Sequence, residues 1–210
     1  MHKTILVILA LLFMPSVALA ADGKIYSLHG DVWINGFHVN ENTPIHFGDR
    51  VLTGAKANIM IVLDENVYRL GSRALFTLPS AQKRGTLSLL YGELLAVFRH
   101  NSNKTLYTKT AVLGVRGTGL YLNSKYDETY LCLCYGDVDL TDVKDANNQA
   151  HIHAEHHNAI VFNHQSRKVK GNQPLLGHVD HDLYELEALA GRISPESFKP
   201  DHKDANRLTF

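Results

Sequence analysis

The chain has 210 residues with 21 basic and 21 acidic side chains, so its formal net charge is zero when histidine is neutral. Without an excess of positive charge it lacks the attraction to phosphates on which nucleic-acid binding depends, and we expect no nucleic acid among its partners. Its compositional bias is toward histidine: there are 13, of which eight follow residue 150. Imidazoles titrate near neutral pH and are common metal ligands. The second half of the chain is therefore rich in potential ligands.

Residues 1–20 have the pattern of a secretory signal peptide. Lys3 gives a basic start, Ile5 to Met14 an apolar run, and Ala18-Leu-Ala20 the small-residue motif read by signal peptidase. We expect cleavage before Ala21 and a soluble, periplasmic product. No later segment is apolar for long enough to cross a bilayer core of about 30 Å, so we expect no membrane span after cleavage.

From Lys24 to about Val143 the chain reads as short β-strands separated by glycine-containing turns. Asn35-Gly36 is typical of a tight hairpin turn. Turn residues recur about every eight to twelve positions, which favours an all-β fold over alternating strands and helices. We predict a β-sandwich or a β-solenoid roll, with a β-domain spanning residues 21–145.

The rest of the chain divides into two parts. Residues 146–165 contain a histidine-rich strand that we expect to complete the sheet. Residues 166–210 form a C-terminal extension with one short helix near 180–190, where three leucines recur at a spacing of three. Asp180 is the predicted N-terminal cap and Gly191 the stop. The helix is expected to lie across the β-domain and bury its leucines, with its acidic residues forming a solvated face.

Several short motifs of the β-region occur in an order specific to one family. They are Gly30-Asp-Val-Trp-Ile34, Gly48-Asp-Arg-Val-Leu-Thr-Gly54, Ala57 to Leu63, Arg69-Leu-Gly71, Gly85-Thr-Leu-Ser-Leu-Leu-Tyr-Gly92 and Ala111-Val-Leu-Gly-Val-Arg-Gly-Thr118. The last run is the strongest. The motifs cover about residues 24–140, and on them the chain resembles the FecR domain family, named for a periplasmic iron-dicitrate signalling protein.

The resemblance implies a periplasmic β-domain that binds a ligand or partner, in the context of iron or envelope sensing. Sigma-factor regulators of this family look like a cytoplasmic segment, a membrane span and then the β-domain. Here the β-domain follows the predicted signal peptide directly. We therefore expect the module and its compartment to carry over, but not the sigma-factor circuit.

The glycines around Arg116 permit positive φ angles and close backbone approach. Two interpretations of Arg116 follow. It is either a buried cation that donates to neighbouring strand carbonyls, or a ligand-binding residue that faces an anion. The first is favoured, because no helix begins here to make a phosphate loop convincing.

Cys132 and Cys134 are the two cysteines, and in an extended strand they project from the same face. A disulfide between residues i and i+2 would be strained, so a reducible bridge, an intermolecular bridge and free thiols all remain open. If 129–142 and 150–162 form an antiparallel hairpin, positions whose numbers sum to about 290 face each other. Cys134 then lies near His156.

The first metal hypothesis joins Cys132 and Cys134 with one or both of His156 and His157. Neighbouring residues of a regular strand point to opposite faces, so only one histidine can join the thiols unless a bulge intervenes. Thiolate and imidazole ligands suit zinc, copper or iron.

The second metal hypothesis is a looser, exposed patch of His151, His153 and His157. A further pattern, Gly177-His-Val-Asp-His181, could bind a metal, although helix capping explains its aspartate more simply. The alternative to any metal role is that the thiols are small core residues and the histidines are solvated.

No catalytic motif is recognisable, and we predict that the protein is not an enzyme. No third residue can be named that would orient a cysteine–histidine pair, and the sequence lacks Gly-x-Ser-x-Gly, His-Glu-x-x-His and a phosphate loop. The leading function is a FecR-like module that binds a periplasmic protein, a glycan or a small ligand. The alternative is a metal- or redox-binding protein that uses the cysteine–histidine site.

Overall fold

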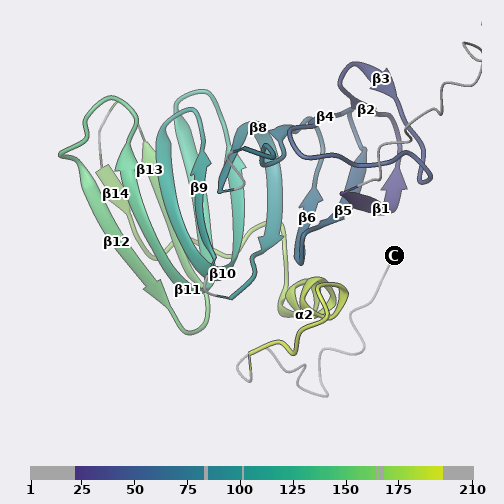
Figure 1. The fold of residues 1–210 in the computed structure, drawn as a ribbon. Helices are drawn as coiled ribbons and strands as arrows, with labels where there is room; N and C mark the ends of the chain where they lie inside the picture. The colour runs from purple at the N-terminus through teal and green to yellow at the C-terminus, as the bar shows by residue number, and fades with distance from the viewer. Residues whose placement is uncertain (1–21, 83–84, 101, 164, 166–167, 196–210) are drawn as a thin grey trace, which may run out of the picture.

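The computed structural model describes residues 22–195 except 83–84, 101, 164 and 166–167. The predicted signal peptide and the end of the predicted extension lie outside the described residues. The described part contains a fourteen-stranded sheet and one helix (Figure 1). No helix in this part is long and apolar enough to span a membrane.

The elements follow one another in a simple order, with the helix last. They are β1 (Gly23–His29), β2 (Val32–Ile34), β3 (Phe37–His38), β4 (Arg50–Thr53), β5 (Asn58–Leu63), β6 (Asn66–Leu70), β7 (Leu75–Thr77), β8 (Thr86–Val97), β9 (Asn103–Tyr107), β10 (Ala111–Ser124), β11 (Glu128–Asp142), β12 (Gln149–Ala154), β13 (Asn158–Asn163), β14 (Lys168–Lys170) and α2 (Asp180–Leu189).

The sheet folds over on itself because the long strand β8 changes partners along its length. Its first half pairs with β7 and β9, and its second half pairs with β6 and β10. Gly92 lies between the halves with φ +84°, a conformation that only glycine adopts readily. The prediction of an all-β fold with one short C-terminal helix is confirmed, and the strands form one continuous sheet.

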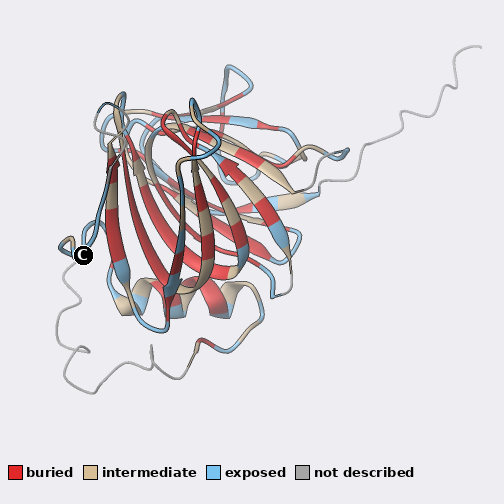
Figure 2. Cartoon of the chain, turned by 90° about the vertical axis from the view of Figure 1, so that its left-hand side faces the viewer, coloured by how far each residue is buried: buried red, intermediate tan, exposed pale blue. Residues whose placement is uncertain are grey.

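Side chains alternate between two apolar layers along the long strands. In β11, Leu131 and Leu133 belong to the large inner core, whereas Cys132 and Cys134 belong to a second cluster on the outer face. This is the period-two alternation of a strand whose two faces are both covered. Figure 2 shows the resulting stripes of buried residues along the strands. The prediction that the two thiols share one face is therefore confirmed.

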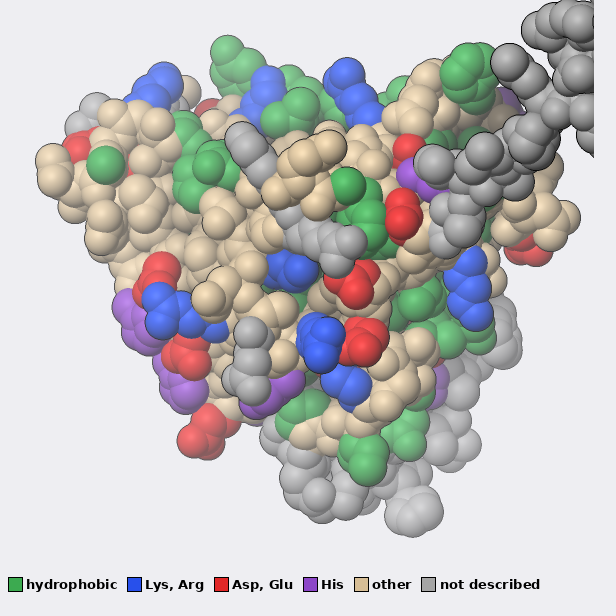
Figure 3. All heavy atoms as spheres, in the orientation of Figure 1, with side chains coloured by type: hydrophobic (Ala, Val, Ile, Leu, Met, Phe, Trp, Pro, Cys, Tyr) green, Lys and Arg blue, Asp and Glu red, His purple; other side chains and the backbone are tan. Residues whose placement is uncertain are grey.

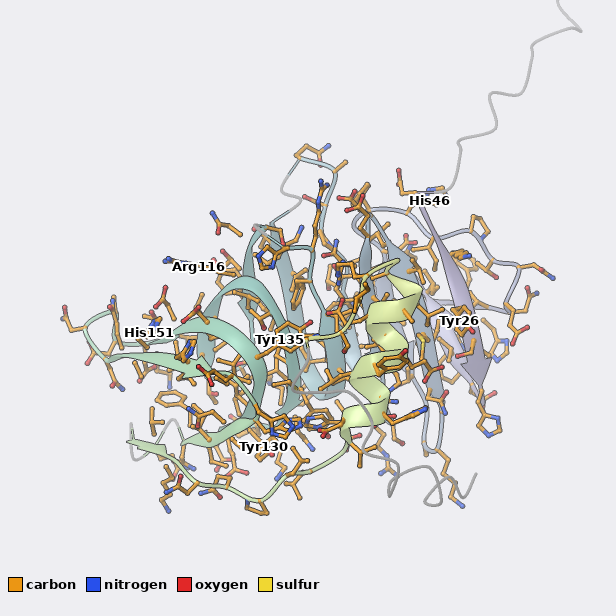
Figure 4. All side chains as sticks on the ribbon, turned by 90° about the horizontal axis from the view of Figure 1, so that it is seen from below. Tyr26, His46, Arg116, Tyr130, Tyr135 and His151 are labelled. Carbon is orange, nitrogen blue, oxygen red and sulfur yellow. The ribbon has the colours of Figure 1, made fainter. Side chains whose placement is uncertain are left out.

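Helix α2 covers part of that outer face. Leu183 and Leu186 are fully buried and share the outer cluster with Val67 of β6 and Leu95 of β8. Figure 4, the view from below, shows the helix lying across the sheet. The expected burial is confirmed for Leu183 and Leu186, whereas Leu189 is only partly buried; Gly191, with φ +72°, follows the last turn as expected.

The polar residues of α2 differ from expectation. The capping carboxylate is that of Asp182, which accepts a hydrogen bond from the Val179 backbone N–H at 2.8 Å, so the prediction of Asp180 as the cap is wrong. The predicted solvated acidic face is also wrong. Asp182 pairs with Arg69 of β6 at 2.6 Å, and Glu187 is only 3% exposed. These carboxylates are held against the sheet because it supplies their partners.

The run Ala111–Gly119 lies inside strand β10, with a register shift between Arg116 and Gly119. Gly119 is required there by close approach: a Cβ atom on it would lie 2.5 Å from Cε1 of Tyr135. The ring of Tyr135 is held in place, because its hydroxyl donates a hydrogen bond to Glu187 of α2. Gly114 is unconfined, since its nearest neighbour would be 3.6 Å from an added Cβ.

The variants Gly119→Ala and Gly114→Ala test this constraint as a matched pair. Gly119→Ala should lower the free energy of unfolding by about 1–3 kcal/mol, the usual cost of overpacking. Gly114→Ala should change it little, because its methyl group meets only ordinary contacts. Equilibrium unfolding in urea measures both. Equal stabilities would show that Tyr135 moves aside without cost.

Candidate metal centre

A one-residue bulge shapes the part of the sheet opposite the thiols. Strand β11 pairs first with β12 and then with β13, and Gly136 faces Ala154 while Leu133 faces Asn158. Three steps along β11 thus correspond to four along the facing chain, so one extra residue is inserted. The hairpin of the sequence analysis is present, and its register is displaced by one position at the thiols.

His157 occupies the bulge and turns toward the thiols. Its φ is +41°, and its backbone N–H donates to the Cys134 carbonyl at 2.9 Å. Its Nδ1 lies 3.4 Å from Sγ of Cys132. His156 does not join the thiols: its side chain is 45% exposed and its Nε2 lies 3.2 Å from Asp180. The bulge thus selects His157 over His156.

The fourth side chain comes from the segment that leads into α2. His178 is 6% exposed, and its Nε2 lies 3.3 Å from Sγ of Cys134. Gly177 has φ +71° and passes so close to the ring of Tyr121 that a Cβ atom there would overlap it. The same ring stacks on His178 at a centroid distance of 5.0 Å. Figure 4 shows Tyr130, another residue of the outer cluster, near the end of the helix that this segment enters.

The four donor atoms of Cys132, Cys134, His157 and His178 all lie within 4.8 Å of one another. A tetrahedral ion with bonds of about 2.3 Å to sulfur and 2.0–2.1 Å to nitrogen places sulfur and nitrogen about 3.5 Å apart. The observed sulfur–nitrogen distances of 3.4 and 3.3 Å fit that geometry. Both thiols are free and buried. The donors fit a single ion of the Cys₂His₂ type.

Each imidazole is oriented by a partner on its other nitrogen. His157 Nε2 lies 2.6 Å from the carboxylate of Asp180, and His178 Nδ1 donates to the Leu176 carbonyl at 2.8 Å. A proton kept on these nitrogens leaves Nδ1 of His157 and Nε2 of His178 unprotonated and directed at the thiols. Such outer partners fix ring orientation in metal sites.

The ionisation of the cluster also suits a cation. Hydrogen bonding from Cys134, and then from the two imidazoles, lowers the pKa of the Cys132 thiol. Burial, and then the neighbouring Cys132, raises the pKa of Cys134. Burial alone would lower the pKa of His157, but hydrogen bonds with Cys132 and Asp180 outweigh it and leave that pKa raised. The lowered pKa of Cys132 favours the thiolate form that a metal ligand requires, and binding of a cation would release any proton that the four donors still hold.

The other predicted residues lie elsewhere. His151 and His153 of β12 are exposed, and they contact Asp139 and Asp137 of β11 at 2.8 and 3.0 Å. Arg116 is exposed and pairs with Asp139 at 2.9 Å, so its interpretation as a buried cation is wrong. In Figure 3 histidine, acidic and basic side chains gather over this end of the sheet, and in Figure 4 Arg116 and His151 lie away from α2.

His178 was the ligand hardest to assign from sequence. It belongs to the pattern 177–181, for which helix capping is the simpler explanation, and it lies 21 positions after His157. Neither strand nor helix periodicity covers residues 171–179, the loop that carries it. A combination of buried thiols, a glycine with φ +71° and a nearby aspartate becomes visible only in three dimensions.

Comparison with known proteins supports the fold and adds no family. No protein-family model matches the chain, and no curated protein matches it. Two crystal structures of a candidate anti-sigma factor from Parabacteroides distasonis are similar, each with a TM-score of 0.50 and 10% sequence identity. The similarity covers 59% of this chain and 59% of theirs, so the chain spans less than two thirds of their length. At this identity the likeness concerns the fold alone.

The orienting role of Asp180 can be tested by the change Asp180→Asn. Zinc affinity of the purified chain should fall by about 10- to 100-fold, the usual effect of losing an outer partner of a ligating histidine. Competition against a chromogenic chelator measures it. Asp137→Asn is the control, because that carboxylate contacts His153 at 3.0 Å outside the centre. Equal affinities of the two variants would leave Asp180 with no part in metal binding.

Proposed function

We propose that the protein is a metal-binding module that holds one zinc ion between Cys132, Cys134, His157 and His178. One observation carries the proposal: four donors, of which three are buried and His157 is 11% exposed, lie within 4.8 Å of one another, and both imidazoles are oriented by partners of their own. Buried thiols that serve only as small core residues need no such arrangement. A desolvated cluster of polar groups is costly unless its members are satisfied.

Zinc is favoured over the other metals considered. Tetrahedral sites with two thiolates and two imidazoles are typical of zinc. Copper(I) is the nearest competitor, because thiolates are soft ligands. A two-iron cluster would place the thiolates and the imidazoles on different iron atoms. That arrangement disagrees with sulfur–nitrogen distances of 3.4 and 3.3 Å.

The donor set also indicates the kind of role. Four protein ligands leave no open position for a substrate or water, which distinguishes structural and regulatory zinc sites from catalytic ones. This agrees with the prediction that the protein is not an enzyme. The role of the ion is therefore to stabilise one conformation of the chain.

The metal content of the purified chain tests the proposal directly. We expect one zinc per chain, measured by native mass spectrometry and elemental analysis under reducing conditions. Cys132→Ser and His178→Ala should each abolish stoichiometric binding. At free zinc 100 times Kd, binding should add about 2.7 kcal/mol to the unfolding free energy.

The matched controls are His151→Ala and His153→Ala, which remove exposed imidazoles outside the centre. Both should keep full zinc binding. Binding that survives His178→Ala but is lost in these variants would place the ion on the exposed patch and contradict the proposal. So would the absence of stoichiometric metal together with a melting temperature unchanged by zinc, copper or iron.

A second candidate function is a FecR-like regulatory module in the periplasm that binds a protein partner. It is supported by the fold shared with a candidate anti-sigma factor and by the motifs of the β-region. The two candidates are compatible, since a regulatory module can bind a metal.

Export is the testable part of this second candidate. The mature protein should be recovered in the periplasmic fraction, and N-terminal sequencing should begin at Ala21. Deletion of residues 2–20 should retain the protein in the cytoplasm. Recovery of a chain that still begins at Met1, bound to the membrane, would contradict a freely diffusing periplasmic module.

A further inference from the structure

The segment from Leu175 to Ala190 closes the metal centre. It supplies His178, the fourth donor, and Asp180, the first residue of α2, which orients His157. The remaining donors belong to strand β11 and to the bulge after β12. An ion bound by all four donors therefore joins this segment to the sheet.

The chain is anchored to the sheet just before the segment begins. The backbone N–H of Gln173 donates to the Ala159 carbonyl at 3.0 Å, and the Tyr130 hydroxyl donates to the Pro174 carbonyl at 2.8 Å. Neither contact involves a metal ligand. Leu175 is thus the point from which the following residues can open while the preceding ones stay in place.

Helix α2 depends on the sheet for its order. It has 10 residues, and isolated helices shorter than about 12–15 residues are marginal in water. Its apolar contact consists mainly of Leu183 and Leu186, and the polar contacts of Asp182 with Arg69 and of Glu187 with Tyr135 add to it. Each residue of the segment loses conformational entropy when the segment closes. These contacts are few compared with the number of residues whose entropy loss they must offset.

The beginning of the segment packs on Tyr121 and also borders a cavity. The cavity, of about 300 Å³, lies beside Gly177 and is lined by Arg69 of β6, Leu95 of β8 and Tyr121 of β10. Missing contacts of this kind lower the free energy of local opening. At this end the segment is held to the sheet by the metal ligand His178 and by Asp180, the partner of His157.

We propose that the ion acts as a latch, setting how firmly residues 175–190 stay closed over the outer face of β6 and β8. The inference rests on the proposed zinc site. Only the closed form presents all four donors, so the binding free energy of the ion is added to closure. At free zinc 100 times Kd, the open population should fall about 100-fold. Loss of the ion lets the segment open and uncovers apolar residues such as Val67 and Leu95 while the sheet remains folded.

Hydrogen–deuterium exchange of the full-length mature chain, with zinc or with EDTA, tests the latch. In EDTA the amides of 175–190 should exchange by local opening, well before those of β10 and β11. Zinc at 100 times Kd should raise the protection of 175–190 by about 100-fold. Cys132→Ser leaves the segment unaltered and should remove the zinc response. His181→Ala changes an exposed imidazole of α2 and should keep it.

The outcomes separate the latch from the proposed function. Zinc that binds stoichiometrically without changing exchange in 175–190 overturns the latch and leaves the zinc site standing. Exchange of 175–190 that matches β10 and β11 in EDTA also overturns it, because the segment then has no opening of its own. Absence of stoichiometric zinc overturns both proposals.

Discussion

The single extra residue opposite β11 determines what the two thiols can do. Without it, His156 or His157 would follow strand alternation, and the neighbouring ladder would continue past Cys134 without interruption. The bulge puts His157 at φ +41°, tied by its backbone to the Cys134 carbonyl. A conformation of this kind is unfavourable for a residue other than glycine. It persists because both ring nitrogens of His157 have partners, one in the sheet and one in α2.

Burial makes the contacts of this cluster important for stability. The outer face of β11 is apolar around it, with Tyr121, Tyr130 and Leu183 in the same layer. Desolvated thiols and imidazoles cost free energy unless each is hydrogen-bonded or bound to a metal. The lowered pKa of Cys132 favours its thiolate, which accepts hydrogen bonds more strongly than a neutral thiol does. The same donors, deprotonated, are those that a tetrahedral cation needs.

Sequence patterns predicted those parts of the structure that depend on periodicity. The all-β class, the shared face of the thiols and the buried leucines of α2 follow from alternation and helical spacing. The hairpin register was displaced by one, because a bulge has no signature in a histidine-rich strand. His178 and the role of Asp180 depend on where a non-periodic loop crosses the sheet. The exposed ion pair of Arg116 could not be predicted, because it depends on the register: Arg116 faces Asp137 of β11 and pairs with Asp139, two positions further along that strand.

The division of the centre between two structural parts has a thermodynamic consequence. Cys132, Cys134 and His157 are preorganised by the sheet, whereas His178 is delivered by a segment with its own opening equilibrium. The apparent affinity for the ion is then reduced by the fraction of molecules in which the segment is open. Coupling of this kind is reciprocal. A partner that binds the open segment, or the face of β6 and β8 beneath it, must therefore lower the affinity for the metal. The metal lowers the affinity for that partner by the same factor. A metal site closed by a short helix can therefore couple metal binding to the binding of a partner, in addition to stabilising the fold.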